Sequence, residues 1–459
     1  MKKALDLNNT IIRDVSSYIS RSTEADLPLE VMEKTKHHIL DTLAAIVSGS
    51  KLKPGQVAIM YANNQAGVHE AQVIGSQILT SAVNAALANG IIAHADETDD
   101  IHVKSRNHPG CAIVPAALSM SEKEGVDGMV FLKGVVVGYD IGCRITQALG
   151  VDNLWQRSSS ISSIGGSFGA AAAAAAVLHL EGDLVRYVLS YTAQQASGLS
   201  YLLRDDEHVE KAFVFGGMPA RNGVTAATLV QSGFTGVRDP FSGEHNFFEA
   251  FSSDSNPTLL TEKLGSHYEI MFASLKKFPV GAPIQAPLQA FLTLMERYRL
   301  TSNNVRSIVA RLPGDFARIV NNRNMPDINL QYILAVTLLD GNLTFGAAHS
   351  FARMKDPLVL EIEKCITLVE DPKLEVNDAE IKRQAIVEVT TKDGTKVREH
   401  VARVRGMVGN LMTREEVERK CKDLVAPVLG EDRSQELIDT IWNLEKVRNV
   451  RELRSLLST

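Results

Sequence analysis

Apolar residues recur at helical spacing through most of the first 270 residues. The run 31–47 shows the pattern most clearly, and Pro28 stands just ahead of it, where the first turn of a helix tolerates proline. Residues 133–149 and 168–180 show the same spacing. We therefore predict a helix over each of these three segments, within a largely helical first part of the chain.

An uninterrupted run of alanine, Ala170–Ala176, lies inside the last of these predicted helices. Alanine has no side chain large enough to hold a neighbouring helix away, so a helix built from it allows close contact on every face. We expect this helix to lie deep in the core, in close contact with other helices.

The pattern changes near residue 270, where Pro279 and Pro283 indicate a crossover into a second domain. Short alternating or continuous apolar runs then predict strands over 305–312, 365–369, 385–390 and 396–401. The last two flank the pair Asp393-Gly394, which is typical of a hairpin turn. Helices are predicted over 283–298 and 329–339, so this part is an α+β domain.

Helical spacing returns from about residue 412. The sequence therefore predicts a mainly α protein with two domains. A large all-helical domain is built from both chain ends, residues 1–270 and 405–459, and a smaller α+β lid domain comprises residues 271–404.

Composition narrows the class of partner. The chain has 459 residues, 45% hydrophobic and 22% charged, which is typical of a soluble globular protein. The net charge is −6 without a basic block, so we predict no nucleic-acid partner. The Gly- and Ala-rich stretch 164–178 is interpreted as a buried helix, so no membrane partner is predicted. The N-terminus has no signal-peptide pattern and the four cysteines form no CxxC pair, which favours a cytoplasmic protein.

Residues 94–108 hold the densest candidate chemistry. Three of the twelve histidines and four carboxylates gather between two apolar, helix-forming segments: His94, His102, His108, Asp96, Glu97, Asp99 and Asp100. The residues themselves allow a metal site, a solvated polar loop or proton transfer. The histidine spacings match no recognised zinc pattern, so we predict no metal.

A serine- and glycine-rich segment, residues 157–169, precedes the alanine run. Hydroxyls and free N–H groups at a helix N-terminus can receive a carboxylate, and Ser160 and Ser162 are the candidate ligands. The alternative is a serine-rich N-cap with no ligand. Lys211 and Lys276 each lie near a bend containing Gly or Pro, where a lysine is either solvated or binds an anion.

Taken in order, these motifs resemble the MmgE/PrpD family, which includes 2-methylcitrate dehydratase, cis-aconitate decarboxylase and iminodisuccinate epimerase. The resemblance runs the length of the chain. It is carried by Leu27-Pro28 with Leu40-Asp41-Thr42-Leu43-Ala44, His94-Ala95 through Asp99-Asp100 to His108-Pro109-Gly110, Gly138-Tyr139-Asp140, Gly166–Ala173, Arg221-Asn222-Gly223, Lys276-Lys277-Phe278-Pro279, Tyr332 and Leu338–Gly341.

The resemblance implies a homodimer of helical domains with α+β lids, an active site between the two domains, and no cofactor. It also implies roles for individual residues. Glu97, His108, Lys276 and Tyr332 are the implied catalytic residues, and Lys211 matches a family lysine with an offset of one residue. Asp99 and His102 are expected near the substrate, where carboxylates of this loop orient a histidine.

Two positions depart from the family pattern. Ile101 stands where the dehydratase-like and decarboxylase-like members have threonine, and Ser160 stands where they have a histidine. Serine does not titrate near neutral pH, so one proton-transfer group is replaced or unnecessary.

The family reactions share removal of a proton alpha to a carboxylate. We predict a lyase that dehydrates a small hydroxy di- or tricarboxylate, in the manner of 2-methylcitrate dehydratase. The alternatives are an epimerase of the iminodisuccinate type, a decarboxylase, and a ligand-binding scaffold that has lost catalysis.

Overall fold

A computed structural model describes residues 2–376 and 382–459, and the side chains of residues 10–376 and 382–459. The chain separates into two compact units. The first comprises Met1–Ala95, Asp99–Ala273 and Arg414–Thr459, and the second comprises Asp96–Thr98 and Ser274–Thr413. Within the described residues, no helix combines the length and apolar character needed to cross a membrane.

The first unit is almost wholly helical, with only two-residue strands. Its elements are α1 (Lys2–Arg21), α2 (Leu29–Gly49), α3 (Lys53–Gln65), β1 (Ala71–Gln72), β2 (Leu79–Thr80), α4 (Ala82–Ala93), β3 (Ile101–His102), α5 (Gly110–Glu124), α6 (Gly128–Leu149), α7 (Val151–Gln156), α8 (Ile161–Val177), α9 (Gly182–Gln195), α10 (Val209–Ala212), the π-helical turn η2 (Phe213–Gly217), α11 (Met218–Gln231), α12 (Phe247–Phe251), α18 (Arg414–Leu429), α19 (Glu431–Trp442) and α20 (Arg454–Leu457).

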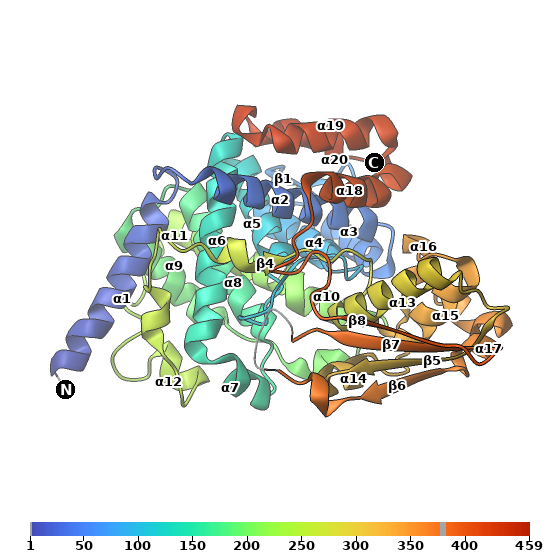
Figure 1. Ribbon diagram of the computed structural model, residues 1–459. Helices are drawn as coiled ribbons and strands as arrows, with labels where there is room; N and C mark the ends of the chain where they lie inside the picture. The colour runs from blue at the N-terminus through green and yellow to red at the C-terminus, as the bar shows by residue number, and fades with distance from the viewer. Residues whose placement is uncertain (1, 377–381) are drawn as a thin grey trace. The chain divides into compact units, whose positions relative to one another are not determined.

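Helix α8 is the centre of this unit, packed against α6 on one side and α11 on another (Figure 1). All seven alanines of 170–176 are at most 1% exposed, which confirms the predicted deep helix. The contacts are close because glycines face backbone: Gly142 of α6 lies against Gly165, and Gly223 of α11 lies against Ala171. A side chain at these glycines would push the helices apart.

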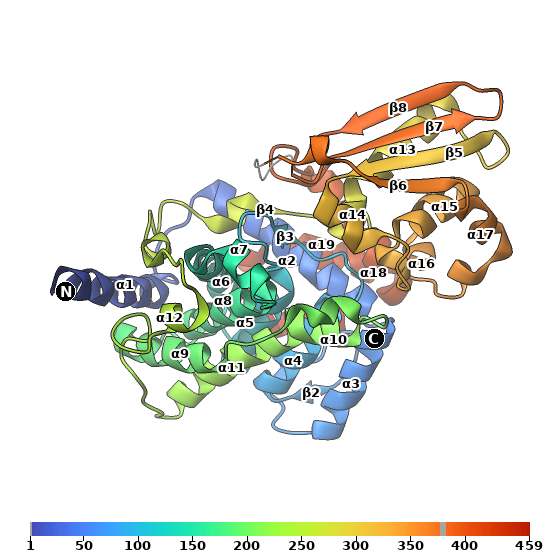
Figure 2. The same ribbon diagram turned by 90° about the horizontal axis from the view of Figure 1, so that it is seen from below.

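The second unit holds a four-stranded sheet in the order β6-β5-β7-β8, and Figure 2 shows the four strands side by side in this order. Strands β5 and β6 are parallel, whereas β7 is antiparallel to both β5 and β8. Helix α13 packs on β7 and β8, and α15 packs on β6. The elements are β5 (Val305–Leu312), β6 (Ile366–Glu370), β7 (Ala385–Thr391), β8 (Lys396–Val401), α13 (Gln285–Tyr298), α14 (Gly314–Val320), α15 (Leu330–Asp340), α16 (Phe345–Ala348) and α17 (Pro357–Glu363), and the chain passes between the units within β4 (Ala273–Ser274).

The predicted fold class, mainly α with a smaller α+β part, is confirmed. Each predicted strand overlaps an observed one, and the hairpin turns at Asp393-Gly394 as predicted. The predicted helix 168–180 was misplaced: α8 begins at Ile161, because its serines and glycines are buried helical residues rather than a loop. The predicted domain boundaries stay a prediction.

We predict that Gly142→Ala destabilises the protein through the α6–α8 contact. The new methyl group would lie 2.7 Å from the carbonyl oxygen of Gly165, so two buried helices must move. We expect the free energy of unfolding to fall by about 1–3 kcal/mol, measured by urea denaturation. Gly182→Ala in α9 is the matched control, because its nearest neighbour would be 3.9 Å away. Equal stability of the two variants would contradict this packing.

Candidate active site

The position of His94 is set by a contact between two backbones. Helix α4 begins at the N-cap Ser81, ends at Ala93 and is followed directly by His94. One turn earlier, Gly90 lies against Gly216 of η2 so closely that a methyl group on Gly216 would come within 1.9 Å of the Gly90 oxygen. This contact places the ring of Phe215 4.7 Å from that of His94, centroid to centroid. Single π-helical turns of this kind are frequent at functional sites.

One carboxylate oxygen binds two histidines. The Oδ2 atom of Asp99 lies 2.9 Å from Nδ1 of His94 and 3.1 Å from Nδ1 of His108. An ionised carboxylate only accepts hydrogen bonds, so both Nδ1 atoms donate. In a neutral ring the lone pair then lies on Nε2. Asp99 therefore fixes the tautomer of both rings, as an orienting carboxylate does in other proton-transfer sites.

Burial distinguishes the two histidines. The side chains of His94 and Asp99 are fully buried, whereas that of His108 keeps 15% of its surface exposed. His108 is therefore the ring of this pair that a ligand in solution reaches. Its ring lies 5.3 Å from Phe215, centroid to centroid, and α5 begins two residues after it.

The next residue, Asp100, anchors the same loop to the core. Its carboxylate accepts hydrogen bonds from Nδ1 of His38 at 2.6 Å, from the Tyr139 hydroxyl at 2.6 Å and from the Gly110 N–H at 2.8 Å. Burial by itself would raise the pKa of Asp100, but these bonds outweigh it and lower that pKa. Burial also lowers the pKa of His38 to about 4. Asp100 therefore stays charged and holds the N-terminus of α5 beside His108.

A small pocket of about 80 Å³ lies on the other side of Phe215. Its walls include Ser160, Ser162 and Arg106, together with apolar side chains of the segment after Leu199. Ser160 is the N-cap of α8, and its hydroxyl accepts the Ser163 N–H. A carboxylate is about as large as the space available, so the predicted serines line a site of suitable size.

Lys211 lies on the same aromatic ring. It comes from α10, and its Nζ is 5.6 Å from the centroid of Phe215, with the residue only 8% exposed. Phe215 thus contacts His94, His108 and Lys211 and also lines the serine pocket. Lys211, Ser160 and Ser162 are therefore gathered around the ring that touches His108, which agrees with their predicted role without testing it.

Glu97 and Lys276 form a second cluster, within the other unit. The Lys276 ammonium donates to the Glu97 carbonyl oxygen at 2.8 Å and to its carboxylate at 3.1 Å. Both residues are buried, and Glu97 has a positive φ of 55°. Such a backbone is costly for a residue with a side chain and recurs at functional sites. The structure brings these two predicted residues together as a buried ion pair.

His102 and Tyr332 are held by their own neighbours. His102 is fully buried, with Nδ1 2.8 Å from the Ser105 hydroxyl and Nε2 3.2 Å from the Glu269 carboxylate. The Tyr332 hydroxyl donates its one proton to the Ala347 carbonyl at 2.5 Å, and burial raises its pKa. Their predicted roles toward a substrate stay predictions, but in this conformation the contacts of both are structural.

Three residues gain importance that the sequence did not give them. His94 shares Asp99, Phe215 joins the clusters and Arg106 lines the serine pocket. His94 belonged to the charged cluster of 94–108 without an assigned role, and Arg106 was not singled out. Nothing in the sequence distinguished Phe215, whose position depends on the contact between Gly90 and Gly216.

Metal binding at this cluster stays untested. Among the described residues, His94, Asp99 and Cys111 place ligand atoms within 4.8 Å of one another. The prediction of no metal rests on the spacing of the histidines and stays a prediction.

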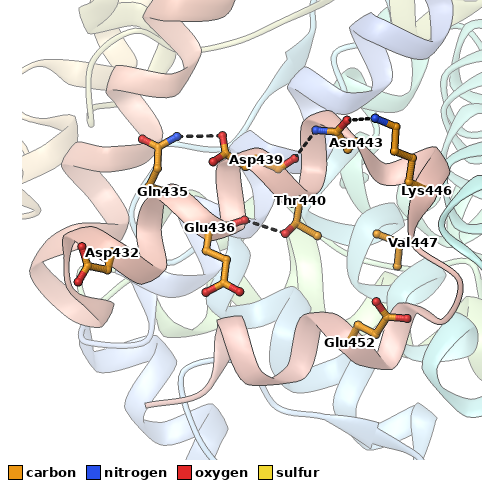
Figure 3. A pocket seen from close by; sticks show the side chains of 9 residues that line it. All are labelled: Asp432, Gln435, Glu436, Asp439, Thr440, Asn443, Lys446, Val447 and Glu452. Carbon is orange, nitrogen blue, oxygen red and sulfur yellow. Dashed lines mark hydrogen bonds between the residues drawn. The ribbon is translucent and has the colours of Figure 1, made fainter.

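A wider, open groove lies on α19, far along the chain from these residues (Figure 3). Its polar side chains mostly bond one another: Gln435 donates to Asp439, Asn443 to the Asp439 carbonyl and Lys446 to Asn443. It contains none of the predicted site residues, and we assign it no role.

Comparison with known proteins gives the same family for both parts of the chain. Residues 13–260 match the MmgE/PrpD N-terminal domain, and residues 278–446 match the MmgE/PrpD C-terminal domain. The cis-aconitate decarboxylase-like protein oryM of Aspergillus oryzae is 24% identical over 480 residues, covering 98% of this chain and 97% of the relative. The cis-aconitate decarboxylases of Aspergillus terreus and Homo sapiens are 23% and 24% identical, covering 100% and 93% of this chain and 98% and 90% of those proteins.

We predict that His38 makes stability depend on pH. The folded protein keeps the ring neutral down to about pH 4, whereas the ordinary histidine pKa is 6.5. As the pH falls through this window the unfolded state gains a proton that the folded state does not, so stability is lost with falling pH. The stability advantage of wild type over His38→Gln should shrink from pH 7 to 4.5, by at most about 1.4 kcal/mol per pH unit.

Urea denaturation at several pH values measures this difference. His69→Gln is the control, because His69 is exposed. A constant difference between wild type and His38→Gln would contradict a buried neutral ring at position 38.

Proposed function

The chain belongs to the MmgE/PrpD family, and we propose that it is a cofactor-independent lyase acting on a small di- or tricarboxylate. The observation that carries the proposal is the Asp99–His108 pair beside a serine-lined pocket. His108 is the base or acid, Asp99 and His94 position it, and the groups around Phe215 bind carboxylate. The full-length relatives reported above bear the names of enzymes, which supports catalysis.

His108 suits proton transfer at carbon for two reasons. Imidazole is the side-chain group most often used as a general acid or base in enzymes. The Nδ1–H bond to Asp99 leaves Nε2 as the reacting atom and stabilises the ring when it becomes positively charged. His94, on the same oxygen and fully buried, keeps Asp99 in place.

The carbanion-like species formed at carbon is stabilised through its carboxylate. Negative charge develops on the carboxylate oxygens, and donors placed before the reaction stabilise it without reorganising. Lys211 supplies a cation next to Phe215. Ser160, Ser162 and the N-terminus of α8 supply hydroxyl and backbone donors.

Dehydration is the first candidate reaction. Nε2 of His108 takes the proton alpha to a carboxylate, and the electron pair of the C–H bond forms the new double bond. The C–O bond at the neighbouring carbon then breaks, and hydroxide leaves as water after taking a proton. A single histidine can serve both proton transfers, which is compatible with a serine at position 160.

Decarboxylation is the second candidate, favoured by the names of the relatives. Here the bond between carbon and one carboxylate breaks, carbon dioxide leaves, and the electron pair takes a proton from protonated His108. Epimerisation requires proton delivery to the face opposite the one that lost it. In the cluster around Asp99, His94 is fully buried, so we rank this reaction third.

A scaffold that has lost catalysis is the remaining alternative, and it predicts no turnover of any carboxylate. The expectations of a homodimer, a cytoplasmic location and independence from cofactors stay predictions.

A product screen tests the proposal. The purified protein is incubated with hydroxy and unsaturated di- and tricarboxylates, including cis-aconitate, and followed by proton NMR and release of carbon dioxide. New vinyl signals without carbon dioxide indicate dehydration, and carbon dioxide with loss of a carboxylate indicates decarboxylation. Absence of turnover across the panel would contradict the lyase proposal.

We predict that His108→Ala abolishes turnover while the fold survives. The side chain lies at the surface of the cluster, so its loss leaves the contact of Asp99 with His94 intact. General acid–base groups contribute about 10²- to 10⁴-fold, and we expect a loss of kcat in that range. Circular dichroism serves as the check on folding. Wild-type activity in this variant would remove the central assignment.

We predict that Lys276→Ala raises KM for anionic substrates about tenfold or more. Removing Lys276 alone also leaves the Glu97 carboxylate buried without this partner, which destabilises the protein. The double variant Lys276→Ala/Glu97→Gln removes both charges and separates stability from substrate binding. An unchanged KM in the folded double variant would show that the pair acts only in folding.

A further inference from the structure

We infer that Arg106 binds a second carboxylate of the substrate and selects di- and tricarboxylates over monocarboxylates. The inference deepens the proposed function and rests on it for the identity of the substrate. It assigns the pocket beyond Phe215 to the carboxylate that does not react. The argument depends on Arg106, on Ser162 and on the segment that holds them together.

The guanidinium group of Arg106 can donate further hydrogen bonds to a ligand. Its Nη2 lies 2.7 Å from the Asp152 carboxylate, and that side chain is 75% exposed. This contact is the ion pair that Arg106 makes among the described residues, and it uses one nitrogen of the guanidinium. Most of the five N–H donors of Arg106 are therefore available to a ligand. A surface ion pair of this kind contributes about 0–1 kcal/mol, so a ligand carboxylate can compete for the guanidinium.

Ser162 supplies a buried hydroxyl at the same place. The residue is 3% exposed and lines the pocket, and no group in the described part of the chain accepts or donates a hydrogen bond to its side chain. The hydroxyl oxygen is not among the fully enclosed polar atoms of the described residues that lack a partner, so it keeps access to the pocket and can meet a ligand there. It therefore indicates a polar ligand at the N-terminus of α8, where the helix dipole favours an anion.

The pocket is held in shape by backbone pairing. Ser159 bridges to Leu199, the Ser160 N–H donates to the Gly198 carbonyl, and the Ser200 N–H donates to the Ser158 carbonyl. Both Ser158 and Arg106 have positive φ, 58° and 48°. Non-glycine residues persist in this conformation only where their surroundings enforce it, which is the condition of a preorganised binding site.

The pocket and His108 lie near the same aromatic ring, that of Phe215. Phe215 lines the pocket, and its ring centroid is 5.3 Å from that of His108. A substrate lying along this ring has its reacting carbon at His108 and a distal carboxylate at Arg106. A carboxylate matches the planar guanidinium in two-pronged hydrogen bonding, and an uncharged group does not.

Tricarballylate, a saturated tricarboxylate that cannot be dehydrated or decarboxylated by these routes, is the binding probe, and butyrate is the monocarboxylate reference. Isothermal titration calorimetry should show that tricarballylate binds wild type more tightly than butyrate does. Arg106→Met should weaken the binding of tricarballylate about 10- to 100-fold, which is the range for the loss of hydrogen bonds to charged groups. The affinity of Arg106→Lys for tricarballylate should lie between that of wild type and that of Arg106→Met.

Arg13→Met is the matched control, because Arg13 is exposed and pairs with its neighbour Asp14. It should bind tricarballylate as wild type does. In turnover, Arg106→Met should raise KM and spare kcat. Equal tricarballylate affinity in wild type and Arg106→Met, or wild-type affinity no better for tricarballylate than for butyrate, would overturn the inference.

The two proposals fail separately. Binding of tricarballylate that depends on Arg106, with no turnover of any carboxylate, would support the pocket and count against the lyase. Turnover of a carboxylate, together with unchanged affinity of Arg106→Met for tricarballylate, would support the lyase and count against the role of Arg106 in the pocket. His108→Ala should still bind tricarballylate, because His108 acts at the reacting carbon.

Discussion

The helices of the first unit meet where one backbone touches another, and this constraint places the site. Gly142 against Gly165 and Gly223 against Ala171 bring α6 and α11 close to α8, and Gly90 against Gly216 brings the end of α4 to η2. None of these contacts tolerates a side chain. Because α4 leads directly into His94 and η2 carries Phe215, the last contact sets the distance between the histidine cluster and the pocket wall.

Two adjacent carboxylates of the loop 94–108 have different partners and different roles. Asp99 faces His94 and His108 and determines which ring atom reacts, whereas Asp100 faces His38 and Tyr139 and fixes the start of α5. Both are fully buried, so each must be satisfied by donors, and the dense polar sequence of 94–108 supplies them. The loop is therefore a structural anchor and a candidate catalytic element at once.

The sequence predicted correctly those elements whose formation depends on residues close together in the chain. The alternation in 305–312 and the Asp-Gly turn before 396–401 located their strands, because pleating and turn geometry act over a few residues. The start of α8 was missed, because serine and glycine resemble a loop until a neighbouring helix buries them. In the site, charge density indicated the segment 94–108 as a whole, and the family resemblance singled out His108 within it. Charge density alone did not separate His108 from His102 or find Phe215, because the contacts of these residues depend on partners distant in sequence.

The central claim is that His108, oriented by Asp99, moves a proton at carbon. The most direct test starts from an unsaturated carboxylate such as cis-aconitate in D₂O, because both its hydration, the reverse of dehydration, and its decarboxylation deliver a solvent proton to carbon. The rate at which deuterium enters a carbon-bound position of the product is compared between wild type and Asp99→Asn. We predict incorporation by wild type and a loss of about 10²-fold or more in Asp99→Asn, because the amide no longer fixes the tautomer of His108. Product free of solvent deuterium, or an undiminished rate in Asp99→Asn, would contradict the account.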